Sequence, residues 1–215
     1  MNNEQKLNLI RSTGIIAIMR ANKSEQLIDA AQAILEGGIR VIEVTLTTPG
    51  ALKVISKVTE NFGDNILFGA GTVLDAESAL SAINAGADFI VSPNLNIEVI
   101  TICLRYGIPV FPGCFTPTEV LTAWQSGATM VKLFPADVGG PAMIKAIRSP
   151  LPQVEIIPVG GVDLRTAADF IRNGASALGV GGSLVNQKIL NGGDFSQLTR
   201  LAKEFLVEVA KGRAE

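Results

Sequence analysis

The 215-residue sequence contains no histidine, and this absence excludes several kinds of catalysis. Neither a Ser-His-Asp triad nor a Cys-His pair can form without an imidazole. A zinc site would need cysteines or carboxylates alone, and the two cysteines, Cys103 and Cys114, do not form a C-x-x-C pattern. We therefore expect no metal and no cofactor, with proton transfer carried out by carboxylates, lysine, tyrosine, cysteine or water.

Long apolar runs and clusters of basic residues are also missing. No run reaches the roughly 18 residues of a membrane span, and the first 14 residues, MNNEQKLNLIRSTG, are too polar for a signal peptide. The formal net charge is −2 and the basic residues are scattered, so there is no electrostatic footprint for nucleic acid. Two isolated cysteines are typical of a reducing compartment. These features predict a cytoplasmic protein that binds neither membranes nor nucleic acid.

What the sequence does contain is a regular alternation of short apolar runs and longer amphipathic segments. Eight runs rich in β-branched residues are expected to be strands, at 14–20, 40–46, 66–71, 88–93, 108–113, 129–134, 155–160 and 176–181. The segments between them, such as 24–38, 75–87 and 116–128, have the apolar spacing of helices. Glycines that can end a helix precede five of the strands, at Gly38, Gly86, Gly107, Gly127 and Gly174. Successive glycines in this set are 48, 21, 20 and 47 residues apart. The intervals correspond to two, one, one and two strand-and-helix units of similar length.

Near-continuous apolar strands covered by helices indicate a parallel sheet buried on both faces. Eight such units in one chain favour a closed (β/α)8 (TIM) barrel of the α/β class, a single domain over 1–215 that includes an N-terminal helix. The alternative is an open Rossmann-like sheet. The first strand lacks the G-x-G-x-x-G turn that a dinucleotide-binding fold places there.

Two charged residues interrupt the apolar strands. Lys132 lies within the sixth run between Val131 and Leu133, so it points into the barrel if those two meet the outer helices. Burial lowers the pKa of a lysine and makes its amine a nucleophile toward carbonyls. Glu43 interrupts the second run and can pair with Lys132 and move protons. The alternatives are a lysine whose ammonium reaches a surface loop and a purely structural buried pair.

Polar residues and glycines at the strand ends complete the candidate site, because the active site of this fold lies at the carboxyl ends of the strands. Arg20 ends the first run and could hold a carboxylate, or belong to a salt bridge at the rim. Thr72 follows the third run, in the segment GAGTV, whose glycines allow a ligand to approach the backbone. Two glycine clusters follow the last two runs and predict a phosphate site made by Gly160, Gly161, Gly181, Gly182 and Ser183.

With these residues identified, the sequence resembles the class I aldolases for 2-keto-3-deoxy-6-phosphogluconate (KDPG) and 4-hydroxy-2-oxoglutarate (KHG). The resemblance covers almost the whole chain through the motifs IEVTLTTP, GAGTVL, FIVSPN, PVFPGCFTPTE, VKLFPAD, PVGGV and GVGGSLV. It implies a lyase of the Entner–Doudoroff type of carbohydrate metabolism, releasing pyruvate and an aldehyde, without a cofactor and as a homotrimer. It also implies roles for the individual residues: Lys132 as the Schiff-base lysine, Glu43 as the general acid and base, Arg20 and Thr72 at the pyruvate carboxylate, Pro93 and Phe134 as pocket walls, and the five glycine-cluster residues as the phosphate cradle.

Two positions depart from the pattern of KDPG-specific members. Thr47 stands where these often have an arginine, and Val159 replaces a threonine before the phosphate loop. Both changes remove polar contacts with the substrate. KDPG, its galactonate epimer, KHG and related 2-keto-3-deoxy acids therefore all remain candidate substrates.

Three alternative functions fit parts of the pattern. A sugar-phosphate epimerase or isomerase would share the barrel and its phosphate loops but would resist borohydride inactivation. A non-catalytic barrel would bind sugar phosphates without cleaving them. A metal-dependent pyruvate aldolase would lose activity in EDTA.

Overall fold

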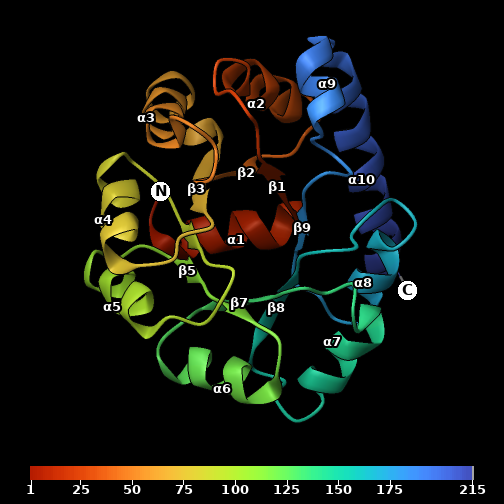
Figure 1. Ribbon diagram of the computed structural model, residues 1–215. Coiled ribbons are helices and arrows are strands. Elements are labelled where there is room, and N and C mark those ends of the chain that lie inside the picture. The colour runs from red at the N-terminus through yellow and green to blue at the C-terminus, as the bar shows by residue number, and fades with distance from the viewer. Residues whose placement is uncertain (215) are drawn as a thin grey trace.

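A ring of parallel strands forms the centre of the structure (Figure 1), a computed structural model that describes residues 1–214. Within these residues the strands are β1 (Ile15–Met19), β2 (Val41–Thr45), β3 (Leu67–Gly71), β4 (Ile90–Val91), β5 (Val110–Phe111), β6 (Gly113–Cys114), β7 (Met130–Leu133), β8 (Glu155–Pro158) and β9 (Leu178–Val180). One hydrogen-bonded sheet has the order β5-β4-β3-β2-β1-β9, and a second has the order β6-β7-β8.

The two sheets form one barrel wall, because β5 and β6 together make up the single strand expected at 108–113. Pro112 separates them, since a proline has no N–H to donate to the ladder. Its carbonyl still accepts the Lys132 N–H at 2.9 Å. On the other side of the ring, a parallel bridge between Val159 and Gly179 connects the last two strands. The predicted (β/α)8 barrel with an N-terminal helix is therefore confirmed.

Helices surround the ring, as Figure 1 shows. The described part of the chain contains α1 (Asn3–Thr13), α2 (Leu27–Glu36), α3 (Ala51–Phe62), the 3-10 turn η1 (Gly63–Asn65), α4 (Ala76–Asn84), α5 (Ile97–Arg105), α6 (Pro117–Gln125), α7 (Gly140–Arg148), α8 (Ala167–Arg172), α9 (Gln187–Gly192) and α10 (Ser196–Ala214). The sequence fixes several helix starts: Asp75 and Asn96 cap α4 and α5, and a Thr116–Glu119 capping box begins α6. None of these helices has the length and apolar character that a membrane crossing requires.

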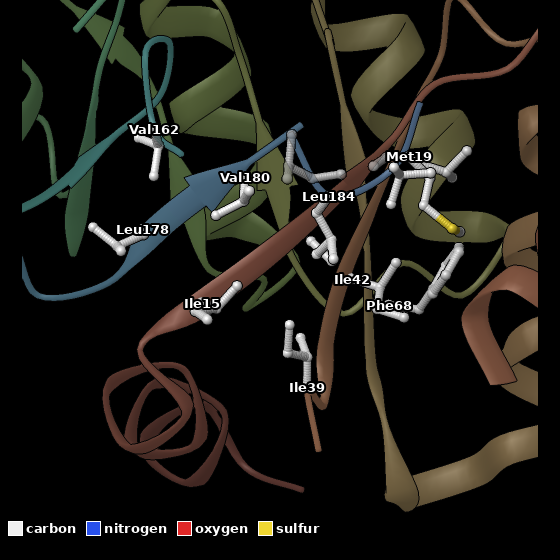
Figure 2. Packing of buried hydrophobic residues seen from close by; sticks show 14 of the residues in the cluster. Ile15, Met19, Ile39, Ile42, Phe68, Val162, Leu178, Val180 and Leu184 are labelled. Carbon is white, nitrogen blue, oxygen red and sulfur yellow. The ribbon is translucent and has the colours of Figure 1, made fainter. Parts of the chain in front are cut away.

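The larger hydrophobic core lies between the strands and the surrounding helices. Figure 2 shows its side chains from four neighbouring strands, including Ile15 on β1, Ile42 on β2, Phe68 on β3 and Leu178 on β9, each less than 1% exposed. These residues alternate with the ones that face the barrel interior, so every strand is covered on both sides. This double burial explains why the strands appear in the sequence as nearly continuous apolar runs.

The smaller core fills the barrel interior and is closed at one end by α1. Leu7 and Ile10 of α1 pack with inward-facing residues of the strands, among them Ile16, Val41 and Met130. In Figure 1, α1 lies across the middle of the ring. Two ion pairs hold the helix there: Lys6 Nζ lies 2.8 Å from Asp88, and Arg11 donates to both carboxylate oxygens of Glu155 at 2.8 and 2.9 Å. The helix therefore closes the barrel at the end opposite to the carboxyl ends of the strands.

Candidate active site

Lys132 projects from β7 into the barrel interior and is 6% exposed. Its neighbours Val131 and Leu133 belong to the outer core, as the alternation of a strand requires. Burial lowers the pKa of the Lys132 amine, the positive charge of Arg20 lowers it further, and the negative charge of Glu43 opposes both. The amine also lies 4.9 Å from the centroid of the Phe134 ring. A buried amine with a lowered pKa is a nucleophile that can attack a carbonyl carbon.

Glu43 projects from β2 into the same interior and is 2% exposed. Burial raises the pKa of its carboxyl, while the positive charges of Lys132 and Arg20 oppose the shift. A carboxyl whose pKa is raised from 4.5 toward neutrality can both accept and donate a proton within one reaction cycle. The interior thus contains an amine and a carboxyl whose pKa values are shifted toward each other.

A small cavity brings these two side chains together. It is lined by Lys132 and Glu43 and otherwise by apolar side chains and one glycine, namely Ile16, Val91, Phe111, Ile157, Val159 and Gly179. Charged groups are costly to keep in such surroundings, and this cost is the physical cause of both pKa shifts. The cavity measures only about 10 Å3, so it places the amine and the carboxyl in one enclosed, largely apolar space.

A larger cleft of about 530 Å3 adjoins this cavity, and Val159 and Gly179 line both spaces. The cleft contains most of the remaining candidates: Arg20, Phe134, Gly160, Gly161, Gly181, Gly182 and Ser183. Thr72 and Pro93 line neither space. A molecule that reacts at Lys132 can therefore extend past Val159 toward the two glycine clusters.

The two glycine clusters differ in why they contain glycine: the first has a backbone that favours glycine, and the second has a backbone that no neighbouring atom covers. Gly160 and Gly161 adopt φ values of 99° and 68°, which side chains other than glycine rarely accept. Asp137 packs against this turn, since a Cβ added to Gly161 would lie 2.6 Å from the Asp137 Cβ. In the second cluster, a Cβ added to Gly181 or Gly182 would meet no atom within 4 Å, so the backbone there is open to a ligand.

Thr72 directly follows β3 and has the strained backbone conformation of φ 57°. A β-branched residue is a genuine outlier in this left-handed region, and such strain is concentrated at functional sites. The backbone N–H of Val73 donates to Val91 at 3.2 Å, which ties this turn to β4. Thr72 follows Gly71, over which the Glu43 carboxyl lies, but it lines neither the cavity nor the cleft.

Thr47, where the family pattern often has an arginine, lies on a different surface. Its hydroxyl is 2.9 Å from that of Thr45, and it lines a separate groove of about 670 Å3 between the β2–α3 loop and α4. Sequence reasoning also did not identify Asn22 and Gln187, which line the cleft and are joined by a 3.3 Å hydrogen bond from the Asn22 N–H to the Gln187 side chain. The only sequence signal for Asn22 was its place two residues after Arg20.

The two cysteines contribute little to this region. Burial raises the pKa of both Cys103 and Cys114 to about 12, so neither thiol ionises near neutral pH. Over residues 1–214, no three His, Cys, Asp or Glu side chains are grouped so that they could hold a metal ion.

Comparison with known proteins identifies close relatives. The family model for KDPG and KHG aldolase matches residues 7–201. A 2-dehydro-3-deoxy-phosphogluconate aldolase of Treponema pallidum (strain Nichols) is 38% identical over 194 residues, which cover 89% of this chain and 91% of that protein. A 2-dehydro-3-deoxy-6-phosphogalactonate aldolase of Escherichia coli (strain K12) is 36% identical over 171 residues, or 79% and 83% of the two chains. A KDPG aldolase of Legionella pneumophila, crystallised with pyruvate as a covalent carbinolamine intermediate, superposes with a TM-score of 0.85 at 30% identity, covering 92% and 96% of the chains.

Proposed function

The chain belongs to the KDPG and KHG aldolase family and is a carbon–carbon lyase, and we propose that Lys132 is its Schiff-base nucleophile and Glu43 its general acid and base. The observation that carries this proposal is the shared small cavity, which holds an amine and a carboxyl among apolar side chains. The carbinolamine captured in the Legionella pneumophila relative supports the same class I chemistry.

The reaction begins when the neutral amine of Lys132 attacks the ketone carbon C2 of the substrate. The resulting carbinolamine loses water with the help of a proton from the Glu43 carboxyl, and a cationic iminium forms. Phe134 presents its ring 4.9 Å from the Lys132 nitrogen, where a cation–π interaction favours the cation.

Carbon–carbon cleavage follows from the iminium. Glu43, now a carboxylate, removes the proton of the C4 hydroxyl, and the electron pair of the C3–C4 bond moves toward the iminium nitrogen. An aldehyde leaves and an enamine stays on Lys132. Glu43 then returns the proton to C3, and water hydrolyses the new iminium to pyruvate and free lysine. One carboxyl can serve each step because its pKa is raised toward neutrality.

The cleft beyond Val159 suits the remainder of the substrate. Backbone N–H groups of the two glycine clusters would hold a phosphate, and Arg20 would attract either a phosphate or a carboxylate. Thr72 and Pro93 would contribute from the rim. A phosphorylated 2-keto-3-deoxy sugar acid fits this division into a reactive cavity and an anion cleft, with glyceraldehyde 3-phosphate as the second product; cleavage of KHG would release glyoxylate.

The same proposal includes a single aldolase domain over residues 1–215. Three copies of this chain would form a homotrimer, located in the cytoplasm. Leu104, Tyr106 and Trp124 are large apolar side chains with exposed fractions of 48, 51 and 41%, and they offer surface for subunit contacts. The two cysteines are unpaired, which suits a reducing compartment. Light scattering at several concentrations should give three times the monomer mass of 22.6 kDa.

Borohydride reduction in the presence of pyruvate tests the nucleophile directly. We expect a reduced pyruvyl adduct on the peptide that contains Lys132, detected by mass spectrometry, together with loss of cleavage activity. The variant Lys132→Arg should form no adduct. The variant Lys145→Arg removes an exposed lysine of α7 and should be labelled like the wild type. An adduct on another lysine, or none in the wild type, would refute the proposed role.

A further inference from the structure

We propose that Gly71 is a positioning residue for the aldol cleavage, because the missing side chain at this position provides the space in which the Glu43 carboxyl lies. The inference rests on the proposed function of Glu43 and adds a residue that makes no contact of its own with the reacting atoms. It assigns a structural reason to the second glycine of the segment GAGTV.

The contact between the two residues is unusually close. A Cβ added to Gly71 would lie 1.7 Å from Oε1, 2.3 Å from Cδ and 2.7 Å from Cγ of Glu43. Real Cβ atoms essentially never come within 3.0 Å of another heavy atom, so the carboxyl oxygen would have to move by more than 1 Å. Three consecutive atoms of Glu43 are affected, and rotation of the terminal carboxylate alone cannot relieve the overlap.

The register of the strands shows that Glu43 leans toward the carboxyl end of the barrel. On β3 the residue paired with Glu43 is Gly69, whereas Gly71 pairs with Thr45, two residues further along β2. The space over Gly69 is filled by the Phe89 ring, which would lie 2.3 Å from an added Cβ. The ring of Phe89 and the carboxyl of Glu43 therefore occupy the two gaps that the inward-facing glycines leave.

The backbone of Gly71 does not itself require glycine. Its φ is outside the positive range of the residues with left-handed backbones, in contrast with Thr72 next to it. An alanine can adopt this extended strand conformation without strain. The reason for glycine is therefore the Glu43 side chain and not the course of the backbone.

A side chain at position 71 would lower the rate of cleavage more than it would lower the stability of the fold. Glu43 is a flexible side chain, and it can turn away at modest cost to the fold. The turned carboxyl would no longer face Lys132 and the C4 hydroxyl of the substrate. A displacement of about 1 Å in a catalytic group can cost on the order of 100-fold in rate.

The variant Gly71→Ala tests the inference, with Gly69→Ala as the matched control on the same face of the same strand. We expect Gly71→Ala to fold, to form the borohydride-trapped pyruvyl adduct on Lys132, and to cleave substrate with a kcat about 100-fold lower and a KM within about threefold of wild type. The pH dependence of its kcat should lose the limb that Glu43→Gln also removes. The methyl group added in Gly69→Ala would overlap with the buried Phe89 ring, so this variant should be less stable than the wild type. Its kcat and the pH dependence of its kcat should be those of the wild type.

A double variant distinguishes positioning of Glu43 from other effects of Gly71. If Gly71 acts through Glu43, then Gly71→Ala/Glu43→Gln should have the same kcat as Glu43→Gln alone. A further 100-fold loss in the double variant would overturn the inference, as would a wild-type kcat in Gly71→Ala. Absence of the pyruvyl adduct in the wild type would instead overturn the proposed function, so the two failures are distinguishable.

Discussion

At the scale of single residues, the charge on Lys132 depends first on burial and then on two side chains that act in opposite directions. The negative charge of Glu43 raises the pKa of the Lys132 amine, and the positive charge of Arg20 lowers it. Schiff-base formation requires the neutral amine, so its rate rises as the pH increases through the pKa of Lys132. This pKa lies below its ordinary value of 10.5 because burial is the largest influence.

Glu43→Gln and Arg20→Gln should therefore shift this rate profile in opposite directions. Removal of the Glu43 charge leaves burial and Arg20 unopposed, and the profile should move to lower pH. Removal of the Arg20 charge should move it to higher pH. The rate of pyruvate-dependent borohydride inactivation across a pH series measures both shifts. Shifts in the same direction would show that the two charges do not act on Lys132 as the structure indicates.

Val159 lines both the reactive cavity and the anion cleft, as Gly179 also does, and the family resemblance implies a threonine at this position in KDPG-specific members. The variant Val159→Thr adds one hydroxyl there without a large change in volume. One hydrogen bond to the substrate is worth about 1 kcal/mol, so kcat/KM for KDPG should rise by about fivefold. Coupled pyruvate-release assays on KDPG, its galactonate epimer and KHG measure the change.

Two controls distinguish an effect of Val159 on substrate selection from a general effect on activity. Pyruvate trapping on Lys132 should change less in Val159→Thr than cleavage of KDPG does, because pyruvate lacks the phosphorylated part of the substrate that would extend into the cleft. Val138→Thr, at a side chain that is 71% exposed, should leave all three activities as in the wild type. An equal change in activity toward every substrate would argue against a role of Val159 in substrate selection.

At the scale of whole elements, α1 closes one end of the barrel through a few apolar side chains. Ile10 is completely buried among inward-facing residues of the strands. Truncation in Ile10→Ala removes this packing and leaves a cavity, so the free energy of unfolding should fall by about 2–5 kcal/mol. Asn3→Ala, on an exposed position of the same helix, should change it by less than about 0.5 kcal/mol. Urea titrations followed by circular dichroism measure both, and similar effects of the two substitutions would contradict this role of α1.

The sequence predicted correctly the elements whose local residue pattern indicates which side chains are buried and where a helix ends. Val131, Lys132 and Leu133 alternate between the outer core and the interior, and this alternation is visible in three consecutive letters. All five glycines expected to end helices, from Gly38 to Gly174, adopt positive φ values. Local pattern and backbone geometry were sufficient for the barrel and for the placement of its central lysine.

Other features depend on contacts between distant segments, and the sequence did not predict them. Glu43 lies over Gly71 and not over Gly69 because Phe89, the residue before β4, fills the nearer gap. The course of the loop after β2 takes Thr47 into a separate groove. In each case the deciding partner is remote in the chain.

At the scale of the whole molecule, the Lys132–Glu43 pair lowers the stability of the barrel in a defined pH range. The folded-state pKa of Lys132 is lowered, so its contribution to stability is fully present above pH 10.5 and is lost as the pH falls through that lowered value. The folded-state pKa of Glu43 is raised, so its contribution is fully present below pH 4.5 and is lost as the pH rises through that raised value. At a pH at which Lys132 is protonated and Glu43 is ionised, the fold bears the cost of burying both charges.

The double variant Lys132→Met/Glu43→Leu replaces both buried ionisable groups by apolar side chains of comparable size. Replacement of buried opposite charges by well-packed apolar residues often stabilises a protein by about 1–4 kcal/mol, so near neutral pH this variant should be more stable than the wild type and have no aldolase activity. The gain should shrink toward both ends of the pH range, because there the wild type no longer carries both charges. Lys132→Met alone leaves Glu43 without its nearest cation and should be less stable than the double variant. Urea midpoints across a pH series measure these differences, and a double variant less stable than wild type near neutral pH would mean that the pair supports the barrel instead of weakening it.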